Sequence, residues 1–148
     1  MNTMYIYIAS AADLDDLTKM GTDLWPENSE EEMRKILTEL MGQQKNEFFL
    51  FRRDGQNIGF IFMSLRSDYV EGSNSSPVGY VEGIYVKPEH RRKGVSAQLL
   101  KRGQEWAKEK GCSQIGSDIY ADNKVSYDFH KAIGFREAGR LIAFIKDL

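Results

Sequence analysis

The sequence predicts an α/β fold of the α+β kind, with a mixed central sheet and four helices. Short runs rich in β-branched and aromatic residues mark strands, and apolar residues at helical spacing mark helices. The predicted order, β-α-α-β-β-β-α-β-α-β, is not the regular alternation of a doubly wound parallel sheet. The chain has 148 residues, which suits one domain. We therefore expect residues 1–148 to form a single domain.

The first half of the chain carries two amphipathic helices between strands. Ser29 and Glu32 form a capping box ahead of an apolar helical stripe. Asp54 and Gly55 separate two apolar runs and are typical of a hairpin turn. The expected elements are a strand at 4–8, a helix at 13–23, a helix from Ser29 onward, and strands at 48–53 and 57–66.

The second half begins with a long polar loop at 67–77. Gly111 and Gly134 each follow an apolar helical stripe, in the position where a glycine commonly ends a helix. The expected elements are a strand at 78–86, a helix at 94–110, a strand at 113–118, a helix at 123–133 and a closing strand at 141–146.

Charge is unevenly distributed along the chain. Residues 13–47 contain ten acidic and four basic side chains, whereas residues 87–110 contain eight basic and three acidic ones. Such halves suit a cationic substrate beside an anionic cofactor, but they also suit two solvated helix faces, and both interpretations stay open. The net charge of −2 argues against a nucleic-acid-binding domain.

The sequence carries no pattern typical of a membrane-spanning, secreted or metal-binding protein. No apolar run has the length of a membrane span, and the N-terminal residues do not resemble a signal peptide. Cys112 is the one cysteine, and His90 and His130 have no metal-ligand spacing. We expect no membrane partner, no metal and a cytoplasmic protein.

The most informative stretch is the basic turn after the strand at 78–86. Arg91, Arg92, Lys93 and Gly94 lead directly into a helix. The first N–H groups of a helix are unpaired and carry positive potential, and glycine lets a ligand approach the backbone closely. The turn therefore predicts a site for a diphosphate, and hence a phosphate-bearing cofactor.

The motif Arg91-x-x-Gly94-x-Ser96 resembles the acetyl-coenzyme A loop of GCN5-related N-acetyltransferases (GNAT). The segment from Asn123 to Phe135 is similar to the second cofactor segment of that family. The resemblance implies six to seven strands, about four helices and acetyl-coenzyme A as acetyl donor. The cofactor contacts that it implies, together with pairing of the pantetheine arm along a strand edge, fall on Ile84, Tyr85, Val86, Arg91, Arg92, Lys93, Gly94, Val95, Ser96, Ala97 and Asn123.

Several separated pieces are similar to bacterial aminoglycoside 6′-N-acetyltransferases. They include Leu24-Trp25-Pro26, Asp68-Tyr69-Val70, Glu82-Gly83-Ile84 and Ser117-Asp118. This resemblance implies acetylation of the 6′-amine of a polycationic aminoglycoside. It implies substrate contacts at Trp25, Tyr69, Glu82 and Asp118. The chain departs from the wider family at Ser96, His130 and Gly139.

The implied catalytic set is Glu82, Asp118, Tyr127 and His130. Glu82 either removes the proton of the acceptor amine or orients that amine. An N–H group of Tyr85 or Val86 could stabilise the oxyanion. Tyr127 packs in the core or protonates the departing thiolate, and His130 is a structural residue or that acid.

Two rival functions stay open. One is a GNAT enzyme for another amine, such as a polyamine, a protein N-terminus or a lysine. The other is a coenzyme A-binding sensor without turnover. The family resemblance also implies a homodimer.

Overall fold

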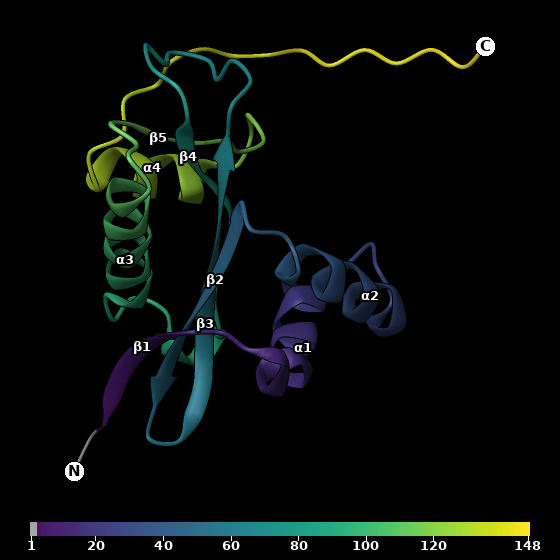
Figure 1. Cartoon of the computed structure of the whole chain (residues 1–148), viewed down its shortest axis with the longest axis vertical. Coiled ribbons are helices and arrows are strands. Elements are labelled where there is room, and N and C mark those ends of the chain that lie inside the picture. The colour runs from purple at the N-terminus through teal and green to yellow at the C-terminus, as the bar shows by residue number, and fades with distance from the viewer. Residues whose placement is uncertain (1–2) are drawn as a thin grey trace.

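The computed structural model describes residues 3–148, which are built around one five-stranded sheet (Figure 1). The strand order is β1-β2-β3-β4-β5, antiparallel except for the parallel pair β4–β5. The strands are β1 (Met4–Ile8), β2 (Asn46–Arg53), β3 (Gln56–Arg66), β4 (Val78–Val86) and β5 (Ile115–Ser117). The helices are α1 (Leu14–Leu24), α2 (Glu30–Met41), α3 (Val95–Glu109) and α4 (Lys124–Ala132), with short 3-10 turns at Ala11–Asp13 and Pro88–His90.

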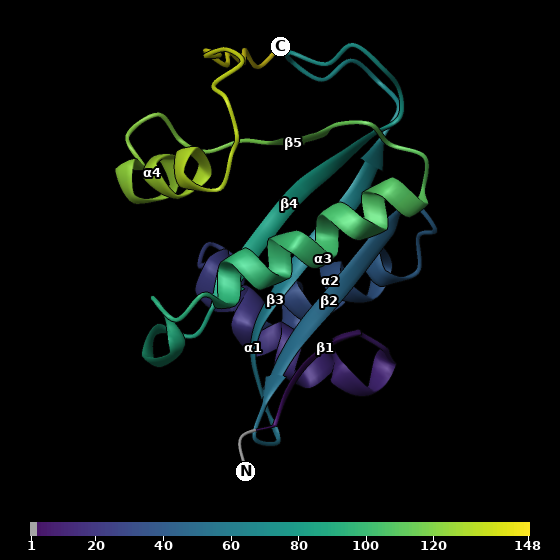
Figure 2. The ribbon, with the colours of Figure 1, turned by 90° about the vertical axis from the view of Figure 1, so that its left-hand side faces the viewer.

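Helices cover both faces of the sheet. The pair α1 and α2 lies on one face and α3 on the other, with α4 beside β5 (Figures 1 and 2). Alternate strand residues supply the two cores, because successive side chains of a strand point to opposite faces. Phe48 and Phe60 pack with Leu17 and Met33 of α1 and α2. The opposite core includes Phe49, Ile61, Met63, Leu99 and Trp106.

Apart from the closing strand, the helices and strands expected from the sequence are confirmed, and most of them begin and end within one or two residues of the expected positions. The Ser29 side chain accepts from the Glu32 backbone N–H at 3.1 Å, and the Glu32 carboxylate accepts from the Ser29 N–H at 3.3 Å. Asp54 and Gly55 have φ angles of 48° and 81°, which are the two left-handed residues of a tight hairpin turn. No helix of residues 3–148 has the length and apolar character that crossing a bilayer requires.

The expected closing strand at 141–146 is not part of the sheet. The sheet has five strands rather than six to seven, and the chain after α4 has no regular structure. Figure 1 shows this C-terminal segment running away from the rest of the chain. Apolar composition predicted a strand, but a strand needs a neighbour for its backbone hydrogen bonds, and no strand of residues 3–148 pairs with this segment.

One irregularity in β4 positions the site. In the pairing of β3 with β4, Phe62 lies opposite Gly83 and Met63 lies opposite Val81. Glu82 is therefore an extra residue, a β-bulge, which bends the strand and shifts the alternation of the residues that follow, so that Gly83 and Tyr85 face α1. Beyond Val81, β4 also loses β5 as a neighbour, because the two strands pair only from Gly79 to Val81.

We predict that Met33→Ala lowers the free energy of unfolding by about 2–5 kcal/mol, because it leaves a cavity in the core beneath α1 and α2. Met33 is 1% exposed and contacts the helix-packing position at Gly21. Denaturant unfolding measures the loss. Met4→Ala is the matched control, since Met4 is 51% exposed on β1, and it should change stability by about 0.5 kcal/mol or less. Equal losses in the two variants would contradict the packing described.

Candidate active site

The sheet opens between β4 and β5, and the predicted cofactor strand lies along this opening. β5 is bonded to β4 only as far as Val81, whereas β3 follows β4 to Val86 (Figure 2). Within the described chain, the β4 edge from Glu82 to Val86 has no strand on the β5 side. Exposed strand edges accept extended, amide-bearing ligands by strand addition. The pantetheine arm of coenzyme A has that chemistry.

The basic turn lies at the end of the same strand and begins α3. Gly94 is the N-cap residue of α3, with a φ of +80°, and no atom of residues 3–148 beyond its neighbours in the chain lies within 4 Å of the position that a Cβ would occupy there. Arg92 also has a positive φ, of 62°. A non-glycine residue in this conformation costs about 1–2 kcal/mol, and such strain concentrates at ligand-binding turns. The unpaired N–H groups of Val95, Ser96 and Ala97 follow at the helix N-terminus.

Arg91 has a different place from its two basic neighbours. Its Nε donates to the carbonyl oxygen of Val86 at 2.7 Å, and its guanidinium lies 5.6 Å from the centre of the Tyr85 ring. Arg91 thus fastens the turn to β4. The side chains of Arg92 and Lys93 are exposed, where they can meet an anion.

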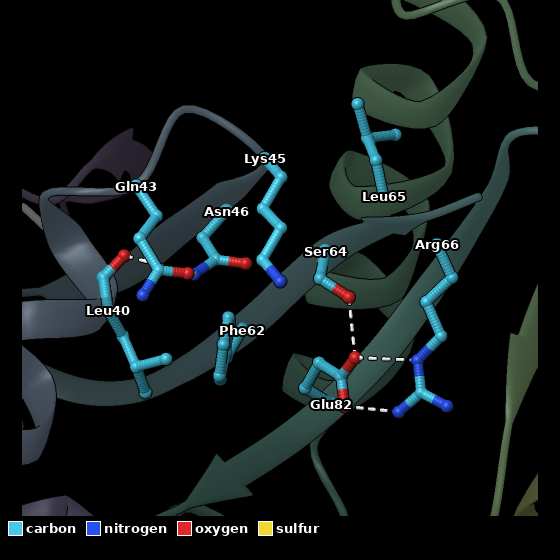
Figure 3. A pocket seen from close by; sticks show the side chains of 9 residues that line it. All are labelled: Leu40, Gln43, Lys45, Asn46, Phe62, Ser64, Leu65, Arg66 and Glu82. Carbon is cyan, nitrogen blue, oxygen red and sulfur yellow. Dashed lines mark hydrogen bonds and ion pairs between the residues drawn. The ribbon is translucent and has the colours of Figure 1, made fainter. Parts of the chain in front are cut away.

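Glu82 is held by two residues of β3 (Figure 3). The Ser64 hydroxyl donates to Oε2 at 2.5 Å. Arg66 donates through Nε to Oε2 at 3.0 Å and through Nη2 to Oε1 at 2.7 Å. This paired geometry fixes the carboxylate orientation, since both oxygens accept from one rigid guanidinium. The hydrogen bonds with Glu82 raise the pKa of Arg66 above its usual value.

Tyr80 joins this group to the second predicted carboxylate. Its hydroxyl donates to Oδ2 of Asp118 at 2.5 Å, and its ring lies 3.5 Å from the Arg66 guanidinium carbon. Burial, then the bond to Asp118, raises the pKa of the Tyr80 phenol. Glu82 and Asp118 are therefore linked through Arg66 and Tyr80, although Glu82 belongs to β4 and Asp118 follows β5.

The two predicted aromatic contacts have different surroundings. Trp25 follows α1 and packs on β4, because a Cβ added at Gly83 would lie only 2.6 Å from its ring. It also lies near Phe60, with 6.0 Å between ring centres, and stays partly exposed. Tyr69 is 75% exposed in the 67–77 loop, where its hydroxyl accepts from the Gly72 N–H at 3.3 Å. The structure does not bring Tyr69 into contact with Glu82 or Asp118.

His130 connects α4 to β5. Its Nδ1 lies 2.7 Å from the carbonyl oxygen of Ser126, so this nitrogen must carry the proton and donate. In the neutral ring, Nε2 then accepts from the Ser117 hydroxyl at 2.8 Å. The imidazole also packs against Phe135, with ring centres 5.0 Å apart. These contacts orient the strand end that carries Asp118.

The remaining predicted residues lie on or beside α4. Asn123 caps the helix, and its side-chain oxygen accepts from the Ser126 N–H at 3.1 Å. Tyr127 donates its hydroxyl to Oε2 of Glu137 at 3.1 Å. The Asn123 amide nitrogen is the group left to meet a cofactor, since the oxygen is engaged in capping.

Ser64, Arg66 and Tyr80 belong to the site but were not predicted from the sequence. The available signal was the alternation along 60–66, which puts Ser64 and Arg66 on one face with Phe60 and Phe62. Two polar residues on a strand face that is otherwise apolar need partners. Ser64, Arg66 and Glu82 line a cavity of about 330 Å³, whose lining also includes Lys45 and Leu40. No cluster of three His, Cys, Asp or Glu side chains suited to a metal occurs in residues 3–148.

Comparison with known proteins assigns the class. The sequence model described as the acetyltransferase (GNAT) family matches residues 14–135, so this chain belongs to the GNAT family of acetyltransferases. It is 39% identical over 144 residues to the aminoglycoside N(6′)-acetyltransferase type 1 of Serratia marcescens, covering 97% of this chain and 99% of that protein.

Two solved structures show the same fold at full length. One is the aminoglycoside N-acetyltransferase AAC(6′)-Iy with coenzyme A, with a TM-score of 0.95 and 34% identity over 100% of this chain and 97% of that chain. The other is AAC(6′)-Iy with the bisubstrate analogue CoA-S-monomethyl-acetylneamine, with a TM-score of 0.93 and 34% identity over 99% of each chain. These likenesses confirm the fold class expected from the sequence.

We predict that Tyr80→Phe lowers the free energy of unfolding by about 1 kcal/mol, because Asp118 loses a hydrogen-bond donor. The raised phenol pKa means that this stabilisation is fully present below pH 10, the ordinary tyrosine value, and is lost at higher pH as the phenol ionises. Denaturant unfolding across pH measures the difference between variant and wild type. Tyr120→Phe is the control, since Tyr120 is 85% exposed. A difference that persists unchanged far above pH 10 would contradict the assignment.

Proposed function

We propose that this protein transfers an acetyl group from acetyl-coenzyme A to the 6′-amine of aminoglycosides, by direct transfer in a ternary complex. The observation that carries the proposal is the position of Glu82, on a bulge where the open β4 edge begins, close to the Asp118 network. A thioester laid along that edge would meet an amine held by carboxylates. The relatives named for aminoglycoside 6′-acetylation support this choice of amine. We treat residues 1–148 as one acetyltransferase domain.

In the proposed reaction, the neutral amine attacks the thioester carbonyl, a C–N bond forms and the C–S bond breaks. The amine loses one proton and the coenzyme A thiolate gains one. Glu82 takes the amine proton, directly or through a water, and Asp118 helps to bind the charged substrate. The β4 N–H of Tyr85 or Val86 donates to the oxyanion. Trp25 offers an aromatic face for a sugar ring, and Tyr69 is a second proposed substrate contact.

For the cofactor, we propose that the pantetheine arm pairs with Ile84, Tyr85 and Val86. The diphosphate binds the N–H groups from Arg92 to Ser96, with Arg91 holding the turn in place. Ala97 and Asn123 complete the cofactor contacts. An anion at this point is favoured by the helix dipole and by the charges of Arg92 and Lys93.

Two residues are candidates for the acid that protonates the thiolate. Tyr127 has a hydroxyl that donates to Glu137, so it has a proton to give. His130 donates already through Nδ1, so it serves as acid only when Nε2 is protonated as well. Tyr127 is therefore the simpler candidate in the neutral state of His130.

Acetylation of kanamycin, spermidine and a lysine peptide, followed by release of free thiol, tests the proposal. We expect kanamycin to be used with a kcat/KM at least about tenfold above the other two. Activity confined to the peptide or to spermidine would replace the proposed substrate. Binding of coenzyme A without product from any amine would favour a sensor.

Site variants separate loss of cofactor from loss of substrate. Gly94→Asp adds a carboxylate at the helix N-terminus in a left-handed conformation, so coenzyme A binding should be abolished. Glu82→Gln and Asp118→Asn should keep coenzyme A binding and lower kcat/KM for kanamycin by about tenfold or more, the effect of about 1.4 kcal/mol. Unchanged kinetics in both carboxylate variants would refute the proposed substrate site.

We also propose that the protein is cytoplasmic and forms a homodimer. Cys112 is buried and free, which suits a reducing compartment. The support for a dimer is the C-terminal segment, which carries large apolar side chains that are more than four-fifths exposed. These side chains are Leu141, Ile142, Phe144, Ile145 and Leu148. Covering each one is worth about 1.5–3 kcal/mol, and a second copy of the chain would cover them.

We predict that the wild type sediments at twice its 17.0 kDa mass and that Ile142→Asp with Ile145→Asp sediments as a monomer, because charges in the segment oppose burial. Sedimentation equilibrium measures the mass. Lys146→Asp is the control within the same segment, and it should stay dimeric because it removes no apolar surface. A monomeric wild type at micromolar concentration would end the proposal.

A further inference from the structure

Arg66 already neutralises the carboxylate that the proposed reaction uses. Its guanidinium gives Glu82 two hydrogen bonds, at 2.7 and 3.0 Å, and Ser64 gives a third (Figure 3). The side chain of Glu82 is 23% exposed and that of Arg66 is 42% exposed, so one side of the pair faces solvent. A substrate amine at Glu82 would therefore meet an ion pair rather than an isolated negative charge.

The groups around Arg66 come from three other parts of the chain. Glu82 and Tyr80 belong to β4, and Asp118 follows β5 and acts on Arg66 through its charge. Lys45, between α2 and β2, lines the same cavity. Among the described residues no ion pair joins Lys45 to Glu82. Arg66 is thus the cation in direct contact with the carboxylate.

We propose that Arg66 is a positioning residue that lowers the pH at which the acceptor amine becomes reactive, by offsetting the charge of Glu82 while holding that side chain in place. The inference rests on the proposed acetyl transfer. It assigns a specific task to a residue that need not touch the reacting atoms. The stack on Tyr80 keeps the guanidinium in the required place.

The need for such a residue follows from two opposing demands on Glu82. A carboxylate attracts the ammonium form of the substrate and raises its pKa, yet only the neutral amine can attack the thioester. A guanidinium beside that carboxylate reduces the negative potential at the amine and adds like-charge repulsion against the ammonium form. Both effects favour loss of the proton.

The test is the pH dependence of the single-turnover rate of acetyl transfer to saturating kanamycin by the enzyme–acetyl-coenzyme A complex. At saturating kanamycin, the part of the profile in which the rate rises with pH (the ascending limb) reflects deprotonation of the bound amine rather than of free kanamycin. In Arg66→Met we expect this limb to move up by about one pH unit, because loss of a neighbouring positive charge raises the pKa of the bound amine. Arg66→Lys keeps the charge but not the two-pronged contact, so its limb should stay near the wild-type position while the rate falls.

Arg34→Met is the matched control. Arg34 also has a side chain that is 42% exposed and is paired with a carboxylate, Asp15, at 2.5 Å, but it joins α2 to α1 away from the site. Its profile should coincide with that of the wild type. The position of a limb does not depend on the amount of folded enzyme, so partial unfolding of Arg66→Met leaves the test valid, and Arg66→Lys provides a second reading.

The outcomes distinguish this inference from the proposed function. A limb in Arg66→Met that coincides with the wild type, whatever its rate, overturns the role of Arg66 alone. A shift of equal size in Arg66→Lys also overturns it, because the charge would then be irrelevant. If the wild type binds coenzyme A but acetylates no kanamycin, the proposed aminoglycoside substrate is refuted, and not the role of Arg66 alone.

Discussion

The site depends on a single additional residue in β4. Alternation from Tyr80 already puts Glu82 on the face of Ser64 and Arg66, and the bulge lets Gly83 and Tyr85 face that same side, toward Trp25 and α1. The bulge also lies where β4 and β5 cease to pair. One local change therefore decides which face the later residues of β4 present, and it lies at the start of a free strand edge. The loop that caps α3 follows from that same edge.

The two faces of the sheet differ in the polarity of the residues that they bury. The core beneath α3 is apolar and holds the helix whose N-terminus carries the basic turn. The core beneath α1 and α2 is apolar near Phe60 but becomes polar toward Ser64 and Arg66. Trp25 lies between these regions, with its ring on Gly83.

Much of this arrangement was predictable because its causes are local. The Ser29 capping box, the Asp54-Gly55 turn and the stripe of α3 involve neighbours in sequence, and each was predicted correctly. The ion pair of Arg66 with Glu82 and the bond from Tyr80 to Asp118 depend on strand register, which sequence patterns do not fix. The closing strand at 141–146 was predicted wrongly. An apolar composition indicates that a segment tends to be buried, but it does not show which surface the segment packs against.

The free edge of β4 has a cost for the empty enzyme. A row of unpaired backbone groups is a template on which another extended chain can add, and this is a common origin of aggregation. The positive charges of Arg92 and Lys93 at the end of the edge repel a second copy of themselves, which limits such contacts. A ligand that occupies the edge would remove the template altogether. Storage with coenzyme A should therefore keep concentrated solutions clear for longer than storage in buffer alone.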